Sequence, residues 1–114
     1  MNLDSYVKKN KVIIDWLKDK SHNNKELGKY YGTLDYATAR FHTILIKLSQ
    51  DKIKSVEKKV DVDHCFKVIQ DFYKYTIKYS NASILMRWYY KNCLHGLGIN
   101  QIPKVKNLLT KLNN

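Results

Sequence analysis

The sequence contains few of the residues that make tight turns, with four glycines and one proline among 114 residues. A β-sandwich or a β-barrel needs a turn roughly every ten residues, and Gly and Pro are prominent in such turns. Long hydrophobic runs are also missing, because stretches such as Val12–Ile14 and Ile84–Met86 are far shorter than the ~20 residues that span a bilayer. The composition therefore favours an all-helical fold and excludes a transmembrane helix.

Acidic residues are outnumbered: 21 Lys and Arg face 10 Asp and Glu, which gives a formal net charge of +11, and 44% of the residues are hydrophobic. This length and hydrophobic content fit one compact domain, residues 1–114, with a single core. They do not fit a two-domain enzyme or a disordered basic tail. The excess of positive charge has no structural use and favours an acidic partner.

Motifs for catalysis are missing from the sequence. The ten carboxylates are scattered, and Asp61 and Asp63 have the positions of helix-capping residues. No phosphate-binding glycine loop and no Gly-x-Ser-x-Gly motif occurs, and Gly96–Gly98 is better explained as a helix stop. We therefore predict that the protein is not an enzyme and that it uses no cofactor and no small-molecule substrate.

A secretion signal is absent as well, because residues 1–4 do not begin a basic segment followed by an apolar one, and this predicts a cytoplasmic protein. Cys65 and Cys93 are then expected to be small buried thiols. With the neighbouring His64 and His95 they make up the ligand set of a structural zinc site. Adjacent residues on a helix point about 100° apart, however, and no Cys-x-x-Cys motif occurs. We predict no metal site.

Apolar spacing and helix-breaking residues predict a compact bundle of about five helices. The predicted helices cover residues 4–20, 24–50, 61–79, 84–94 and 103–112. The third helix has a strongly aromatic buried face. The fourth helix is surrounded by apolar residues and is expected at the centre of the bundle, with Gly96 and Gly98 ending it. Pro103 is expected near the start of the last helix.

The strongest pattern lies in residues 24–50, where apolar residues recur at intervals of seven in two columns. The columns are Leu27, Leu34, Phe41 and Leu48, and Tyr30, Ala37 and Ile44. Such a pattern over more than three heptads predicts one long helix with a buried stripe. Gly28 and Gly32 cost about 1 kcal/mol each relative to Ala, and we interpret them as places where a partner helix approaches closely.

Lysine and arginine also recur at helical spacing, so three of the predicted helices carry rows of cations. The first-choice phosphate contacts are Lys25, Lys29, Arg40 and Lys47, and the second set is Lys67, Lys74, Lys78, Arg87 and Lys91. Such rows follow a phosphate backbone and release counterions, which makes binding depend on salt. Tyrosine and tryptophan alternate with these cations and are suited to base stacking, although most rings at helical spacing belong to a core.

Residues 24–42 resemble a helix-turn-helix motif, in which Leu27, Gly28 and Gly32 match the first helix and the turn. Residues 36–40 are similar to a recognition helix. This resemblance implies a sequence-specific DNA-binding regulator. It requires a one-residue insertion at Thr33, and it breaks the apolar stripe there.

Read as one helix, the pattern Leu27-Gly28-Lys29-x-Tyr31-x-x-Leu34 resembles the Leu-Gly-rich helix in the large subunits of type I CRISPR surveillance complexes, a region that can also be made as a separate small subunit. The resemblance implies a helical subunit of an antiviral nucleoprotein complex, present in several copies, that holds nucleic acid through its backbone. From this resemblance only Leu27, Gly28 and Leu34 are carried over, as packing positions.

These observations predict a non-enzymatic helical protein that binds DNA or RNA with little sequence selectivity, together with other subunits of a larger assembly. Two alternatives remain. One is the helix-turn-helix regulator. The other is a small inhibitor or immunity-type protein, of the kind that phages and mobile elements encode, whose basic surface docks an acidic protein.

Overall fold

The structure is a computed structural model. It describes residues 3–19, 25–50 and 58–113, apart from the side chains of residues 25–27 and 29. The elements are α1 (Leu3–Asp19), α2 (Lys25–Gln50), α4 (Lys59–Asn81), α5 (Ile84–Gly96), the π-helical turn η1 (Leu97–Gln101) and α6 (Ile102–Asn113). Every element in the described ranges is helical, so the predicted fold class is confirmed.

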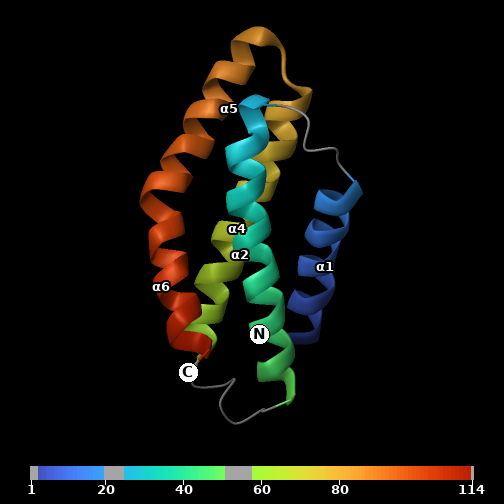
Figure 1. The fold of residues 1–114 in the computed structure, drawn as a ribbon, viewed down its shortest axis with the longest axis vertical. Helices are drawn as coiled ribbons and strands as arrows, with labels where there is room; N and C mark the ends of the chain where they lie inside the picture. The colour runs from blue at the N-terminus through green and yellow to red at the C-terminus, as the bar shows by residue number, and fades with distance from the viewer. Residues whose placement is uncertain (1–2, 20–24, 51–57, 114) are drawn as a thin grey trace.

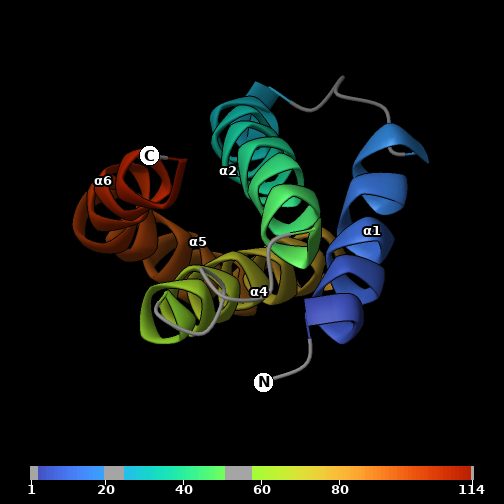
Figure 2. The same ribbon diagram turned by 90° about the horizontal axis from the view of Figure 1, so that it is seen from below.

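The helices form an elongated bundle of 48 × 27 × 20 Å (Figure 1). α5, η1 and α6 follow one another without a break and form one curved rod. The described residues therefore make four rods, one fewer than the sequence predicted. Seen along the long axis, α2 lies between α1 and α6, and α4 lies across the bundle from α2 (Figure 2). α2 packs against all three of these helices.

The apolar stripe of α2 forms the centre of the core, as its spacing predicts. Leu34, Phe41 and Leu48 are buried, and so are Tyr30, Ala37 and Ile44 of the second column. The side chain of Leu27 lies outside the described part of the chain. The expectation for Gly28 and Gly32 is wrong, because a Cβ atom on either glycine would meet no atom within 4 Å. These glycines do not mark a close contact between helices.

Aromatic rings join α1 to α4. The Tyr6 ring stacks on the Phe66 ring with centroids 4.4 Å apart, and the Tyr6 hydroxyl donates a 2.7 Å hydrogen bond to Asp63 Oδ1. Trp16 packs edge-on against Tyr73 at 5.3 Å. The predicted aromatic face of α4 is confirmed. Its predicted start is not, because α4 begins at Lys59 and uses Asp63 to hold α1.

The prediction for residues 84–103 is wrong in two respects. Gly96 and Gly98 do not end the helix, because neither has a positive φ and the chain passes through η1 directly into α6. The π-helical turn precedes Pro103, which has no N–H to donate, and such turns commonly accommodate local irregularities in a helix.

The second error concerns the position of α5, which is not central. α5 packs on α4 and on η1, and Leu94 is the one buried residue in this fully described helix. Apolar residues on every side of a helix predict burial on every side. The bundle provides α5 with a neighbour on one side only, so its first two turns are exposed to solvent.

Candidate nucleic-acid interface

The nine predicted phosphate contacts lie on three helices. Seven of them have described side chains, and all seven are exposed: Arg40 and Lys47 on α2, Lys67, Lys74 and Lys78 on α4, and Arg87 and Lys91 on α5. Lys25 and Lys29 belong to α2, but their side chains lie outside the described residues. Exposure leaves each of the seven cations accessible to a phosphate, so their relative positions decide what they can bind together.

The cations of α2 share a surface with α6. Lys47 Nζ donates a 3.0 Å hydrogen bond to Asn113 Oδ1, and Lys106 Nζ lies 5.3 Å from the centre of the Tyr36 ring. Arg40 lies between these two contacts, one turn after Tyr36 and seven residues before Lys47, on the same side of α2. We name Tyr36, Arg40, Lys47, Lys106 and Asn113 the α2–α6 basic surface. Sequence reasoning missed Lys106.

No carboxylate among the described side chains pairs with this surface. The two ion pairs in the described residues join Lys11 to Asp15 and Lys111 to Asp61, and both lie elsewhere. Asp35, beside Tyr36 in sequence, points about 100° away around α2. All ten Asp and Glu residues precede residue 72, so α6 contains none. That one-sided distribution is the signal that could have indicated α6 as part of a basic surface.

The cations of α4 face the other way. At 100° per residue, Lys67, Lys74 and Lys78 lie within about 40° of one another, on the side of α4 opposite its buried face. Since α2 and α4 lie across the bundle from each other, this row points away from Arg40 and Lys47 (Figure 2). The α4 lysines and the α2–α6 basic surface therefore do not form one continuous surface.

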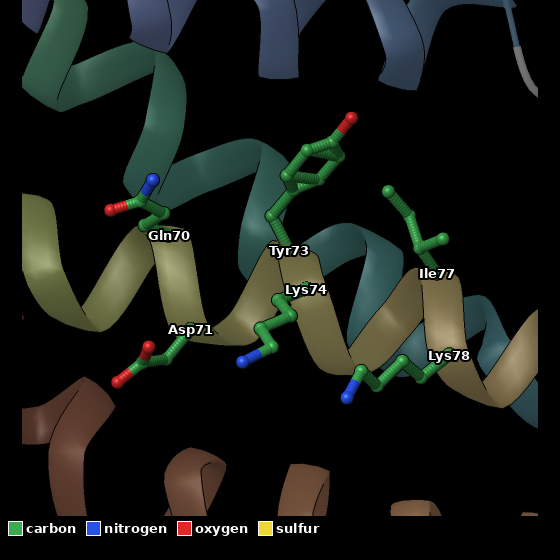
Figure 3. A pocket seen from close by; sticks show the side chains of 6 residues that line it. All are labelled: Gln70, Asp71, Tyr73, Lys74, Ile77 and Lys78. Carbon is green, nitrogen blue, oxygen red and sulfur yellow. The ribbon is translucent and has the colours of Figure 1, made fainter.

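A shallow groove of about 530 Å³ runs along this face of α4. In Figure 3, Tyr73 and Ile77 project from one side of the helix, whereas Asp71, Lys74 and Lys78 project from the other. The carboxylate of Asp71 therefore stands in the row of lysines and reduces its positive potential. The positive potential along the α4 row is therefore lower than its lysine count suggests.

Cations and tyrosines also meet where α4 packs on α5. Lys78 Nζ lies 5.7 Å from the centre of the Tyr90 ring, and the Arg87 guanidinium lies 5.8 Å from that of Tyr79. A cation over an aromatic face is attracted by the quadrupole of the ring. Both cations are therefore directed toward the seam between the helices, and the two rings serve as packing partners rather than as exposed stacking platforms.

The two cysteines are not joined in a disulfide. Both are free thiols; Cys65 is buried, as predicted, and Cys93 is half-buried. Burial, and then the negative charge of Asp61, raises the pKa of Cys65 to about 12, so the nucleophilic thiolate does not form at neutral pH. The described residues contain no group of three or more metal-ligating side chains.

Two further findings bear on the function classes. Residues 25–50 form one continuous helix, so the turn that the helix-turn-helix resemblance needs at Gly32 and Thr33 does not exist, and that interpretation is wrong. Among the described helices, none has the length and apolar content to cross a membrane.

Comparison with known proteins provides no functional precedent, because no protein-family model, no curated protein and no solved structure matches this chain.

Proposed function

We propose that this protein binds the phosphate backbone of nucleic acid at the α2–α6 basic surface, without catalysis and with little preference for sequence. One observation carries the proposal. Three exposed cations from two helices, Arg40, Lys47 and Lys106, share a surface on which no described carboxylate pairs with them. Side chains in this arrangement neutralise neighbouring phosphates and release their counterions.

The position of α2 in the bundle favours backbone contact over base reading. A single helix fits into the ~12 Å wide major groove of DNA when it projects from its protein. α6 packs alongside α2, next to the side of α2 that carries Arg40 and Lys47, so α2 cannot enter that groove alone. Arg40 and Lys47 are seven residues apart, or about 10 Å along the helix, a spacing that allows them to contact different phosphates.

The test is fluorescence anisotropy with labelled single-stranded DNA, duplex DNA and single-stranded RNA of several sequences, at a series of salt concentrations. We expect binding that ignores sequence and weakens as salt increases. The pair of substitutions Arg40→Glu and Lys47→Glu should weaken binding to all sequences alike. It should also make the slope of log K against log salt less steep by about 2, because each lost phosphate contact reduces the slope by about 0.9.

A matched control separates this surface from the overall charge. Lys67→Glu with Lys74→Glu changes the net charge by the same amount on the opposite side of the bundle, and we expect it to weaken binding less. Equal weakening by both pairs would assign binding to overall charge and contradict the proposed surface. Absence of binding at low salt would contradict nucleic-acid binding by the isolated chain and favour an acidic protein partner.

Membership of a CRISPR-type nucleoprotein assembly remains a prediction that depends on the resemblance of one helix. Affinity purification from the natural host, once without and once with nuclease treatment, tests it. Recovery of a fixed set of protein subunits, lost after nuclease digestion of a shared guide RNA, is the expected result. Recovery of the chain without other subunits would contradict it.

A further inference from the structure

The first two turns of α5 expose a contiguous apolar face. Its members are Ile84, Leu85, Trp88 and Tyr89, which are 84%, 85%, 71% and 51% exposed. The spacing i, i+1, i+4, i+5 places all four on one side of the helix, opposite the buried Leu94. We name these four residues the α5 patch. The proposed phosphate-binding surface makes no use of it.

The size of the α5 patch requires a physical explanation. Together with the adjacent exposed Met86, its side chains present on the order of 600 Å² of surface. Soluble monomers rarely expose contiguous apolar patches larger than a few hundred Å², and a standard protein interface buries about 800 Å² on each partner. The patch is thus close to the size of one half of a stable interface. Isolated exposed apolar residues such as Val60 need no such explanation.

Charge decides which partner fits this face. The α5 patch itself contains no charged residue. The nearby Arg87 is directed to the Tyr79 ring and Lys78 to the Tyr90 ring, both at the seam between α4 and α5, so of these cations only Lys91 lies at the edge of the patch. Nothing in the face therefore selects an acidic partner, and two copies of it can meet without placing like charges at the centre of the contact.

We infer that the α5 patch pairs with the same patch of a second copy of this chain, with the two α5 helices antiparallel about a two-fold axis. A two-fold contact is self-complementary, so residues at the start of one patch meet those at the end of the other. Ile84 and Leu85 then pack against the partner's Trp88 and Tyr89. The two Lys91 side chains stand at opposite ends of the contact. They are separated along the helix axis by the rise of nine residues, which is about 13 Å. This exceeds the Debye length of about 8 Å at physiological salt.

The experiment measures the mass of nuclease-treated protein, free of nucleic acid, by size-exclusion chromatography with light scattering, up to about 100 μM, where a micromolar dissociation constant gives mostly dimer. We expect twice the 13.5 kDa chain mass. Leu85→Ser with Trp88→Ser should give a monomer. Val60→Ser, at a 79% exposed position on α4, is the matched control and should leave the dimer intact. Circular dichroism checks that each variant retains its helices.

A second measurement follows Trp88 directly. In a Trp16→Phe variant, Trp88 is the single remaining tryptophan, and its emission should move to shorter wavelength as the protein concentration rises. The dimer should persist or strengthen with added NaCl, whereas docking of an acidic partner would weaken with it. The inference would be overturned by a monomer at all concentrations or by a dimer that survives the double substitution. It would also be overturned if the Trp88 emission moved to shorter wavelength only when phosphatidylglycerol vesicles were added. None of these results depends on nucleic-acid binding.

Discussion

Two buried threonines differ in how their hydroxyl groups are satisfied. Thr38 on α2 and Thr76 on α4 are both fully buried. The Thr76 hydroxyl donates a 2.7 Å hydrogen bond to the Phe72 carbonyl, whereas the Thr38 Oγ1 atom has no hydrogen-bond partner among the described residues. The Thr38 carbonyl instead accepts a 3.0 Å hydrogen bond from Asn10 Nδ2, which links α2 to α1. A buried hydroxyl without a partner carries its desolvation cost uncompensated.

We therefore expect Thr38→Val to raise the free energy of unfolding by about 1 kcal/mol, because it removes that cost at nearly constant volume. Thr76→Val is the matched change, because it exchanges the same two residue types in a helix. It should leave the free energy of unfolding unchanged or lower it by up to about 1 kcal/mol. Urea denaturation of both variants measures the difference. A loss of stability in Thr38→Val comparable to that in Thr76→Val would show that the Thr38 hydroxyl is paired in solution.

At the scale of the helix, the glycines of α2 provide a second test. Gly32 is exposed about two turns after the start of α2, lacks a positive φ, and has room for a Cβ atom. Gly32→Ala should raise the free energy of unfolding by about 1 kcal/mol through helix propensity alone. Ala39→Gly, at another exposed position of the same helix, should lower it by a similar amount. Destabilisation by Gly32→Ala would reveal a close contact at this position that the isolated chain does not show.

The elements differ in how well the sequence predicts them. α2 is predicted almost to the residue, because its heptad pattern identifies one buried face and leaves the opposite face polar. α5 is misplaced, because its apolar residues surround the helix and their spacing cannot reveal how many neighbours cover it. Leu85 and Leu94 have the same residue type and opposite exposure for that reason.

The candidate site is predictable only within one helix. Arg40 and Lys47 can be placed on the same side of α2 by their spacing alone. Lys106 joins them because α6 packs alongside α2, and which faces of two helices become adjacent is decided by packing across the whole bundle. For the same reason the sequence could not show that Lys67 and Lys74 point away from this surface.

At the scale of the whole molecule, positive charge opposes folding and favours binding. The net charge is +11, and all ten carboxylates lie before residue 72. The charged residues of α5 and α6 are therefore all cations. Cations held close together in a folded chain repel one another, and this repulsion destabilises the compact state. A bound polyanion would relieve it. Salt screens the same charges, so it should act in opposite directions on folding and on binding.

We therefore expect the midpoint of urea denaturation to rise when NaCl is increased from about 20 to 200 mM, over the range in which the Debye length falls from about 20 Å to below 8 Å. Nucleic-acid affinity should fall over the same range, because counterion release contributes less. The Lys67→Glu, Lys74→Glu variant, whose net charge is four units less positive, should gain less stability from salt than the wild-type chain, at equal protein concentration. A midpoint that falls with salt would instead mean that attractive ion pairs, such as that of Lys111 with Asp61, outweigh repulsion among the cations.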